Sequence, residues 1–452
     1  MSTMFPVRRA LWLSLLCTAC VASCSSSTPV DPDTRAPFVG WLTPTVTAGD
    51  TVFVFTEDTT TVVLNAGDDG GIISRVQVYL DGALAATLTA APYQTQLSLA
   101  GIRNNRSARV WATATDPTGK IGSTADTLRF VHSVLPDTAT WSQLSPAQSP
   151  LARDGFTWEL DPATETAYLF GGYSIFTFSS LGDLWSFDLS TNQWDSLSPL
   201  GVAPPARVRH GAGLAAGTMV IFAGQFFDLS GDSLLEDYAL LDLGTLTWNA
   251  GQFDLALRPT QAMSTATFGN DVYAFGGVDI SGQAHDTLLR YHVTTDQWQS
   301  LSPVNSLPGA RASALVAANL EDADLFLFGG NSGVITDPPA SASNYRLDLG
   351  SLTWASTAAP GPPALAEGGA IYDSALHRIL VWGGRDGAGG HPVEVWEFAL
   401  GAFSWRQVPT MGTSPTGRTG HRIVYDAARR RLVMFGGRDG ATFLSETWEL
   451  SW

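Results

Sequence analysis

Cysteine is almost absent from this chain of 452 residues, and its three cysteines, Cys17, Cys20 and Cys24, all lie close to the N terminus. Beyond Cys24 the sequence therefore excludes an internal disulfide and excludes thiol catalysis. Long apolar runs are scarce as well. Only Ala10 to Ala19 forms an extended apolar stretch, so no later segment is expected to span a bilayer.

Positive charge is also scarce, because 25 Lys and Arg residues stand against 42 Asp and Glu residues, and Lys120 is the one lysine. Residues 1–23 contain two arginines and no acidic residue, so their removal would change the net charge from −17 to 23 minus 42, or −19. This excess of negative charge disfavours nucleic acid and anionic lipid surfaces as partners.

The sequence lacks the common local motifs of catalytic and metal sites. Its seven histidines are scattered, with no His-x-His or His-Glu-x-x-His spacing. Neither a Gly-x-Ser-x-Gly elbow nor a phosphate-binding loop is present. We therefore predict no metal, no cofactor and no catalytic residue from local motifs.

The N terminus has the pattern of an export signal, with Arg8 and Arg9 before the apolar stretch. Val21-Ala22-Ser23-Cys24 resembles the bacterial lipobox, which implies lipidation of Cys24 and cleavage after residue 23. Ser25 then favours the outer membrane, facing the periplasm or the cell surface, and residues 24–36 are a flexible tether. An ordinary signal peptide with chance cysteines remains an alternative, and either the general or the twin-arginine export route remains open.

A motif of four apolar residues followed by a glycine pair recurs six times after residue 160, with Ala223-Gly224 in place of the pair in the second copy. Its aromatic residues are separated by steps of 52, 53, 53, 54 and 53, and they are Phe170, Phe222, Phe275, Phe328, Trp382 and Phe435. Such an apolar run is typical of a strand buried on both faces, and the glycines allow positive φ angles. A fixed period near fifty residues predicts a repeat architecture.

Each repeat has a second constant feature, a tight hairpin that ends in tryptophan. The hairpin tryptophans are Trp194, Trp248, Trp298, Trp354 and Trp405. Each unit therefore reads as a four-stranded meander. One such sheet cannot bury its own apolar faces, but six sheets around an axis can, and we expect the tryptophans to fill the junctions.

These motifs resemble the kelch family, and the resemblance implies a six-bladed β-propeller over residues 134–452. The sixth unit ends at Trp452 without a fourth strand. Residues 138–145 match the fourth strand of the first unit, since Trp141 precedes Trp194 by one period of 53 residues. We therefore expect this N-terminal strand to complete the sixth blade and close the ring.

Residues 37–133 form a separate unit with short β-branched runs and turn signals. Val76, Val78 and Leu80 alternate with Gln77 and Tyr79, as in one face of a half-buried sheet. The unit resembles bacterial immunoglobulin-like modules and predicts a β-sandwich. The fold class is therefore all-β, a sandwich followed by a propeller.

The first candidate site consists of residues that lead into the inner strands. Four of the six repeats have an arginine there, namely Arg153, Arg207, Arg311 and Arg418, and His210 and His421 follow three residues later in two of them. Converging guanidinium groups could clamp an anionic ligand. The alternative is that each arginine pairs with a carboxylate of its own or the next blade and stabilises the ring.

The second candidate site consists of the loops that follow the glycine pairs, which differ from blade to blade as a binding surface would. The candidates are Tyr173, Phe226, Arg385, Asp386, Arg438 and Asp439. Aromatic residues beside Arg and Asp suit a glycan or a protein ligand. The alternative is that these loops pack on their own strands.

The resemblance to the kelch family also suggests two enzymatic functions. A copper radical oxidase on a kelch propeller needs a tyrosine that is crosslinked to a cysteine. The mature chain has no cysteine that could form this crosslink. A sugar epimerase or mutarotase would use Glu367, His210 and His421. We favour a lipid-anchored envelope protein whose propeller binds a protein or a glycan, over a sugar-acting enzyme or a purely architectural protein. Membrane contact is expected only through the lipid.

Overall fold

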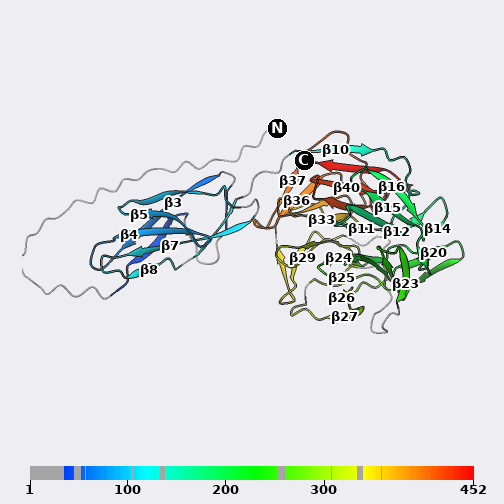
Figure 1. The fold of residues 1–452 in the computed structure, drawn as a ribbon, viewed down its shortest axis with the longest axis horizontal. Helices are drawn as coiled ribbons and strands as arrows, with labels where there is room; N and C mark the ends of the chain where they lie inside the picture. Colours follow the sequence, from blue (N-terminus) through cyan, green and yellow to red (C-terminus); the bar gives the residue numbers. More distant parts are fainter. Residues whose placement is uncertain are drawn as a thin grey trace, which may run out of the picture.

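The computed structural model describes residues 35–44, 52–55, 58–102, 106–125, 127–132, 138–251, 260–306, 308–332, 340–357 and 359–452. The regular elements of this part of the chain are all strands. Figure 1 shows strands up to β9 in one elongated unit and the later strands in a rounded unit. The described residues contain no helix of sufficient length and hydropathy to cross a bilayer.

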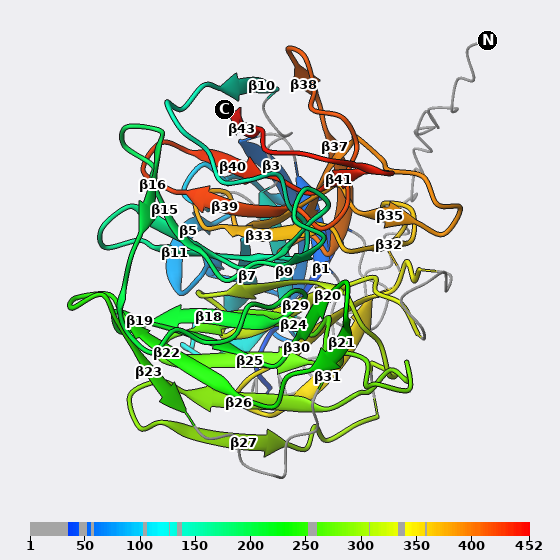
Figure 2. The same cartoon turned by 90° about the vertical axis from the view of Figure 1, so that its right-hand side faces the viewer.

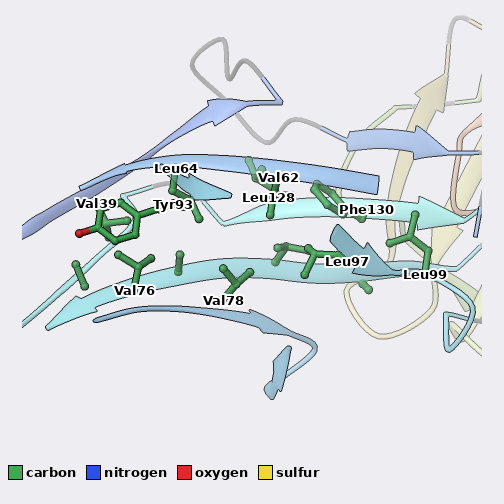
Figure 3. Packing of buried hydrophobic residues seen from close by; sticks show 14 of the residues in the cluster. Val39, Val62, Leu64, Val76, Val78, Tyr93, Leu97, Leu99, Leu128 and Phe130 are labelled. Atoms are coloured by element: carbon green, nitrogen blue, oxygen red, sulfur yellow. The ribbon is translucent and has the colours of Figure 1, made fainter. Parts of the chain in front are cut away.

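The N-terminal unit is a sandwich of two sheets, with strand orders β1-β3-β6 and β2-β9-β7-β4-β5, and β8 paired to β7. Val76 and Val78 are fully buried while Gln77 between them is not, as the alternation predicts. Aliphatic side chains with Tyr93 and Phe130 fill the core (Figure 3). The strands are β1 (Phe38–Thr43), β2 (Val52–Phe55), β3 (Thr59–Gly67), β4 (Arg75–Leu80), β5 (Ala83–Leu88), β6 (Tyr93–Ser98), β7 (Ser107–Thr115), β8 (Ile121–Ser123) and β9 (Leu128–His132).

The second unit is a six-bladed β-propeller, as the repeat predicts, and each blade is an antiparallel sheet. Blade one comprises β11 (Thr157–Asp161), β12 (Thr166–Phe170), β15 (Leu184–Asp188) and β16 (Gln193–Leu197). Blade two comprises β18 (Gly211–Ala215), β19 (Thr218–Phe222), β22 (Tyr238–Asp242) and β23 (Thr247–Gly251). Blade three comprises β24 (Ser264–Phe268), β25 (Asp271–Phe275), β26 (Leu288–His292) and β27 (Gln297–Leu301).

The other three blades have the same design. Blade four comprises β28 (Leu315–Asn319), β29 (Asp324–Phe328), β30 (Asn344–Asp348) and β31 (Thr353–Thr357). Blade five comprises β33 (Gly369–Asp373), β34 (Arg378–Trp382), β36 (Val395–Ala399) and β37 (Ser404–Val408). Blade six comprises β39 (Arg422–Asp426), β40 (Arg431–Phe435), β43 (Thr447–Ser451) and β10 (Ala139–Leu144), and short parallel strands β17 (Leu200–Gly201) and β38 (Thr410–Met411) extend blades two and six.

The fourth strand of blade six comes from the segment that the repeat singled out, residues 138–145. Strand β10 pairs antiparallel with β43, and Trp141 lies opposite Leu450. Each inner strand contacts the inner strands of both neighbouring blades, in the cyclic order β11, β18, β24, β28, β33, β39 and back to β11.

A repeated aromatic contact joins neighbouring blades. The aromatic residue before each glycine pair packs against a fourth-strand tryptophan of the next blade in five cases, and Trp382 packs against Trp141 of β10 in the sixth. Ring centroids are 4.8 to 5.6 Å apart in the pairs Phe170–Trp248, Phe222–Trp298, Phe275–Trp354, Phe328–Trp405, Trp382–Trp141 and Phe435–Trp194. Each such contact contributes about 0.5–1.5 kcal/mol beyond the burial of its apolar area.

The glycine pairs bring the backbones of neighbouring blades together. The second glycine donates its N–H to the residue that leads into the next inner strand, with N···O distances of 2.8 to 3.0 Å, and the six acceptors are the carbonyls of Arg207, Thr260, Arg311, Leu365, Arg418 and Arg153. The first glycine of blade three, Gly276, has a φ of 75°, and a Cβ there would lie 2.0 Å from the carbonyl oxygen of Arg311. A side chain at that position would push the blades apart.

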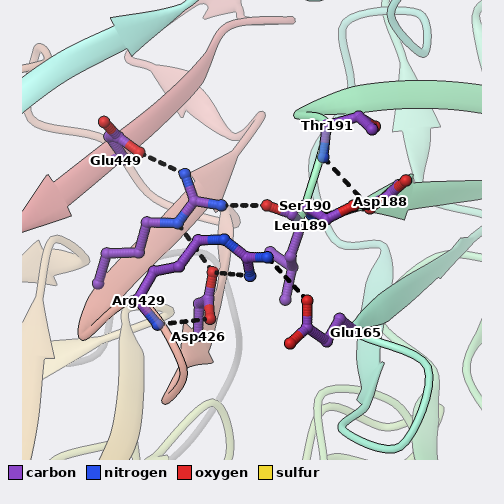
Figure 4. Close-up of polar contacts among 9 residues, drawn as sticks. Glu165, Asp188, Leu189, Ser190, Thr191, Asp426, Arg429 and Glu449 are labelled. Atoms are coloured by element: carbon purple, nitrogen blue, oxygen red, sulfur yellow. Dashed lines mark hydrogen bonds and ion pairs between the residues drawn. The ribbon is translucent and has the colours of Figure 1, made fainter.

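An ion-pair network joins blade six to blade one beside the N-terminal strand (Figure 4). The guanidinium of Arg431 donates to Asp426 at 2.9 Å, to Glu449 at 2.6 Å and to the carbonyl of Leu189 in blade one. Arg429 reaches Glu165 of blade one at 2.8 Å. The first and last blades are therefore joined by polar contacts as well as by aromatic packing.

Candidate functional site

Short two-stranded ribbons follow or flank the glycine pairs, and Figure 2 shows β20, β21, β32, β35 and β41 on the same side of the propeller, which we call the loop face. The ribbons are β13 (Tyr173–Ser174) with β14 (Ser179–Ser180), β20 (Gln225–Asp228) with β21 (Gly231–Leu234), β32 (Leu365–Ala366) with β35 (Arg385–Asp386), and β41 (Arg438–Asp439) with β42 (Thr442–Phe443). The loops of different blades thus meet around the propeller axis.

A closed ring of six backbone hydrogen bonds surrounds the axis just before the inner strands begin. Each member donates its N–H to the equivalent member of the preceding blade at 2.7 to 3.0 Å, and the six are Gly155, Arg209, Ala262, Ser313, Glu367 and Gly420. All six have φ between 53° and 68°. We call this set the axial ring. Two members carry charged side chains in a left-handed conformation that non-glycine residues rarely adopt, which singles out Arg209 and Glu367.

Two cavities meet at the axial ring. The mouth cavity, about 750 Å³, lies on the loop face and is lined by loops of blades two, three, five and six. The channel cavity, about 440 Å³, extends along the inner strands of five blades, and blade two contributes Arg209 and His210, which precede its inner strand. Arg209 lines both cavities, so its guanidinium lies where the mouth opens into the channel.

The mouth cavity has a cationic lining in a strongly acidic protein. Arg209, Arg385 and Arg438 contribute from three blades, beside His391. The Nε of Arg438 donates to Asp154 at 2.8 Å, whereas the guanidinium of Arg209 makes no hydrogen bond or ion pair with any described residue. The hydrogen-bond donors of the Arg209 guanidinium are therefore available to an anionic group, although Asp154 and Glu367 lie close enough for Arg209 to affect their pKa values.

The aspartates of the mouth cavity already have partners. Asp232 accepts from the Nε2 of Gln225 at 2.7 Å. Asp279 accepts from Ser281, from the backbone N–H of Gln283 and from His285, and these hydrogen bonds, the one from Ser281 above all, lower the pKa of Asp279 to about 2. Asp279 is therefore ionised at neutral pH, and the hydrogen bonds hold both carboxylates in place.

Glu367 and Asp154 lie near Arg209 on the channel side. Burial raises the pKa of Asp154 above its usual value, although Arg209 and Arg438 oppose the shift. Burial also acts to raise the pKa of Glu367, but Arg209 and the 2.8 Å hydrogen bond from Thr419 outweigh it, and the pKa of Glu367 stays below its usual value. Glu367 is therefore ionised at neutral pH.

The structure corrects the first candidate site. Arg153, Arg207 and Arg418 are fully buried and Arg311 is 8% exposed. Each donates through Nη1 to the first residue of its own glycine pair (Ala223 in blade two) at 2.9 to 3.2 Å, and three of them bind a carboxylate of the same blade, in the pairs Arg153–Asp183, Arg207–Asp237 and Arg418–Glu446. Arg311 instead lies over the ring of Tyr345. The leading arginines therefore stabilise the blades and form no anion clamp.

The two histidines of the same motif are buried as well. His210 accepts from or donates to Thr157 of blade one at 2.8 Å, and the ring of His421 packs edge-on against Trp382 with centroids 5.0 Å apart. Burial holds the pKa of both rings well below the usual value, so they are neutral. Buried, neutral rings of this kind suit a packing role for His210 and His421 rather than the epimerase or mutarotase chemistry considered above.

The aromatic residues of the loops gather over three blades. Tyr173 of blade one packs against Phe227 of blade two and Phe443 of blade six, with centroids 5.4 and 5.7 Å apart. Phe226 is half-buried, and Phe176 and Phe178 are 67% and 48% exposed. We call Tyr173, Phe227 and Phe443 the aromatic cluster.

The remaining loop candidates have different surroundings. The Oδ1 of Asp386 accepts the N–H groups of Ala388 and Gly390 at 2.9 and 2.7 Å, so this side chain shapes its own loop. Asp439 is exposed at the ribbon of blade six, and Arg385 lines the mouth cavity. Within the described ranges, no group of three or more His, Cys, Asp or Glu side chains is arranged to hold a metal ion.

Sequence reasoning missed Arg209, Asp154, Glu159 and Arg422, which all line the channel cavity. A signal for Arg209 was present, because the position two residues after each leading residue holds Gly155, Arg209, Ala262, Ser313, Glu367 and Gly420. Two charged residues among small ones stand out in that alignment. The other three residues differ from their counterparts without any such pattern.

Residues 118–330 and 261–452 match the family described as the KLHDC2/KLHL20/DRC7 Kelch-repeats domain. The chain belongs to the kelch-repeat family. Residues 37–112 match the bacterial Ig domain family, in agreement with the sandwich. Membership of the kelch family indicates a binding module rather than a particular reaction.

Several curated proteins resemble this kelch protein. It is 27% identical to kelch domain-containing protein 3 of Bos taurus over 340 residues, 70% of this chain and 72% of the relative. It is 26% identical to the flagellar outer arm dynein alpha chain of Chlamydomonas reinhardtii over 64% of this chain. Host cell factor homolog hcf-1 of Caenorhabditis elegans is 25% identical over 52% of the chain. The chain spans only 7% and 32% of these last two relatives.

Proposed function

We propose that this kelch protein is a binding module of the bacterial cell envelope, and that its mouth cavity receives an acidic segment of a partner protein. The observation that carries the proposal is the convergence of Arg209, Arg385 and Arg438 from three blades on one cavity of about 750 Å³. Kelch membership supports a protein ligand. Charged and aromatic loop side chains equally suit a glycan, so acidic glycans are the alternative that must be tested.

Electrostatics supports an anionic ligand. A guanidinium binds a carboxylate through two parallel hydrogen bonds, and such charge-assisted bonds are about twice as strong as neutral ones. The side chain of Arg209 makes no hydrogen bond and no ion pair within 4.0 Å with any described residue, while Asp232 and Asp279 accept hydrogen bonds from their neighbours. An acidic side chain that enters the mouth therefore meets an unfilled donor at the axis.

The aromatic cluster supplies apolar area beside this charge. Phe443 lies directly opposite Arg438 in the ribbon of blade six, and Phe227 lies on the same strand as Gln225, which lines the mouth cavity. Exposed aromatic side chains next to polar groups are typical of protein-binding surfaces. A peptide could thus place acidic groups in the mouth and apolar groups on the cluster.

The test measures binding of the lipid-free mature protein to poly-L-glutamate, polygalacturonate, dextran and poly-L-lysine by isothermal titration calorimetry at physiological salt. We expect poly-L-glutamate to bind saturably and to bind at least tenfold more weakly to Arg209→Gln. Arg290→Gln is the matched control. Tighter binding of polygalacturonate would replace the protein ligand with a glycan, and no saturable binding of either polyanion would refute the mouth as an anion site.

We further propose that the protein is exported and anchored to the membrane through lipidated Cys24. This cysteine lies outside the residues that the structure describes. Support comes from the lipobox-like Val21-Ala22-Ser23-Cys24 and from the polar segment that follows it. Metabolic labelling with a palmitate analogue tests the anchor. The label should be incorporated by the wild type and lost in Cys24→Ser, and equal labelling of both proteins would contradict the proposal.

A further inference from the structure

Two opposite charges line the channel cavity without forming an ion pair, although Arg422 is close enough to oppose the effect of burial on the pKa of Glu159. Glu159 lies on β11 and Arg422 begins β39, and these strands are in contact. The carboxylate of Glu159 makes no hydrogen bond, and no ion pair within 4.0 Å, with any described residue. Arg422 donates a single side-chain hydrogen bond, 3.0 Å to the carbonyl of its neighbour His421. Both side chains are half-buried and line the cavity.

A fully buried arginine elsewhere in the propeller, by contrast, binds two carboxylates of its own blade. Arg378 is completely buried, and its guanidinium binds Asp373 at 2.8 Å and Glu397 at 2.5 Å. Unfilled polar groups in a protein interior are costly unless water or a ligand satisfies them. Glu159 and Arg422 therefore present unfilled hydrogen-bonding capacity to a cavity of about 440 Å³, a volume typical of small-molecule sites.

The other charged groups of the channel cavity are separately accounted for. Asp154 accepts from Arg438, and Glu367 accepts from Thr419. Arg209 lies at the axial ring, where the mouth cavity begins. Among the described residues, Glu159 and Arg422 thus line the channel cavity as two opposite charges that form no ion pair within 4.0 Å.

The chemistry of the pair defines its ligand. An anion would satisfy Arg422 and leave Glu159 unpaired, and a cation would do the reverse. Burial raises the pKa of Glu159 to about 7, with Arg422 opposing the shift, so a nearby ammonium group would favour the ionised form. Much of the remaining lining is small and apolar, including Ala266, Ala317 and Ile371, which suits a short hydrocarbon spacer.

We propose that the channel holds a second site, separate from the mouth cavity, for a small zwitterion whose carboxylate binds Arg422 and whose ammonium group binds Glu159. The ligand class is an amino acid with its charged groups separated by a short methylene chain. This proposal goes beyond the binding of a macromolecule at the loop face and does not depend on it.

The test titrates the mature protein with three probes of matched length, 4-aminobutyrate, butyrate and butylamine, and with the ω-amino acids from glycine to 6-aminohexanoate. Binding is followed by calorimetry and by saturation-transfer NMR. One or more of the ω-amino acids should bind at least tenfold more tightly than butyrate or butylamine. Equal binding of butyrate would mean a simple anion site, and the absence of saturable binding throughout the series would also overturn the proposal.

Variants separate this site from the mouth. Glu159→Gln keeps the shape of the side chain and should weaken zwitterion binding at least tenfold, as should Arg422→Gln. The exposed Glu236→Gln is the matched control. Arg385→Gln should weaken poly-L-glutamate binding at the mouth and leave the amino acid unaffected. Wild-type affinity in Glu159→Gln would refute the assignment, and the comparison among probes on the wild type remains decisive if a variant fails to fold.

Discussion

Arg207 and Arg209 are two residues apart in the chain, but they have different surroundings. Arg207 is fully buried and binds Asp237 at 2.8 Å and the carbonyl of Ala223 at 3.1 Å. Arg209 lines both cavities, and its side chain makes no hydrogen bond and no ion pair within 4.0 Å with any described residue. Arginine thus stabilises a blade at position 207 and faces the proposed ligand site at position 209.

The leading arginines predict a stability effect. Arg418→Ala should lower the free energy of unfolding by about 2–4 kcal/mol, because it removes bonds to Gly436 and Glu446 and leaves a buried carbonyl without its donor. Urea denaturation measures the change. Arg290→Ala, which removes a hydrogen bond from a half-buried side chain to Gln299, should change stability by less than about 1 kcal/mol. An equally small change in Arg418→Ala would contradict the structural role.

Glu159 predicts a pH-dependent stability difference. Its pKa is raised to about 7 by burial, so the unfolded chain loses this proton near pH 4.5 while the folded protein keeps it to about pH 7. Its contribution to the free energy of unfolding is therefore complete below pH 4.5 and declines as the pH rises towards 7. Glu159→Gln cannot titrate. The free energy of unfolding of this variant, relative to that of the wild type, should rise by on the order of 1–3 kcal/mol between about pH 4.5 and pH 8. If the free energies of unfolding of the two proteins change with pH in parallel, the prediction is wrong.

His421 predicts the opposite behaviour in acid. Burial holds its pKa well below 6.5, so the unfolded chain binds a proton below pH 6.5 that the folded protein does not. The free energy of unfolding therefore falls as the pH falls below 6.5. In His421→Phe this loss should be smaller than in the wild type by about 1–2 kcal/mol at pH 5. Urea denaturation at several pH values measures it, and an unchanged acid slope would show that His421 does not contribute.

At the scale of the element, strand β10 and the fourth-strand tryptophans make equivalent contacts. Trp141 of β10 packs against Trp382 of blade five as Trp354 packs against Phe275 of blade three. Trp141→Ala and Trp354→Ala should each cost about 3–5 kcal/mol of stability. Thermal unfolding of the two variants tests the equivalence, and a Trp141→Ala protein as stable as the wild type would mean that β10 does not support the ring.

The repeated features were the predictable ones. The glycine pairs, the apolar strands and the tryptophans recur because each blade solves the same packing problem, and six copies separate that signal from local variation. The sandwich was predictable from the alternation in residues 76–80 and from turn signals. The leading arginines recur for the same reason, and recurrence itself indicated their structural role.

The candidate site was harder to predict because ligand-facing residues differ from blade to blade. Arg385 and Arg438 were nominated from the loops and do line the mouth cavity, whereas Glu159 and Arg422 were not nominated. Strands β11 and β39 carry the latter two into one cavity from opposite ends of the propeller sequence. A single sequence contains the residues but not this three-dimensional proximity.

At the scale of the whole molecule, charge is distributed unevenly. The chain carries a net charge of −17, but the mouth cavity is lined by three arginines and by aspartates that are already hydrogen-bonded. An anionic ligand is repelled by most of the surface and attracted at one place, which favours selective over non-specific association.

One paired measurement tests most directly whether the propeller binds its ligand at the mouth: the stability and the poly-L-glutamate affinity of Arg207→Gln and Arg209→Gln. Arg207→Gln should lose about 2–4 kcal/mol of stability. Arg209→Gln should have a free energy of unfolding within about 1 kcal/mol of the wild-type value and should bind poly-L-glutamate at least tenfold more weakly. Wild-type affinity in a folded Arg209→Gln protein would contradict a binding site at the mouth.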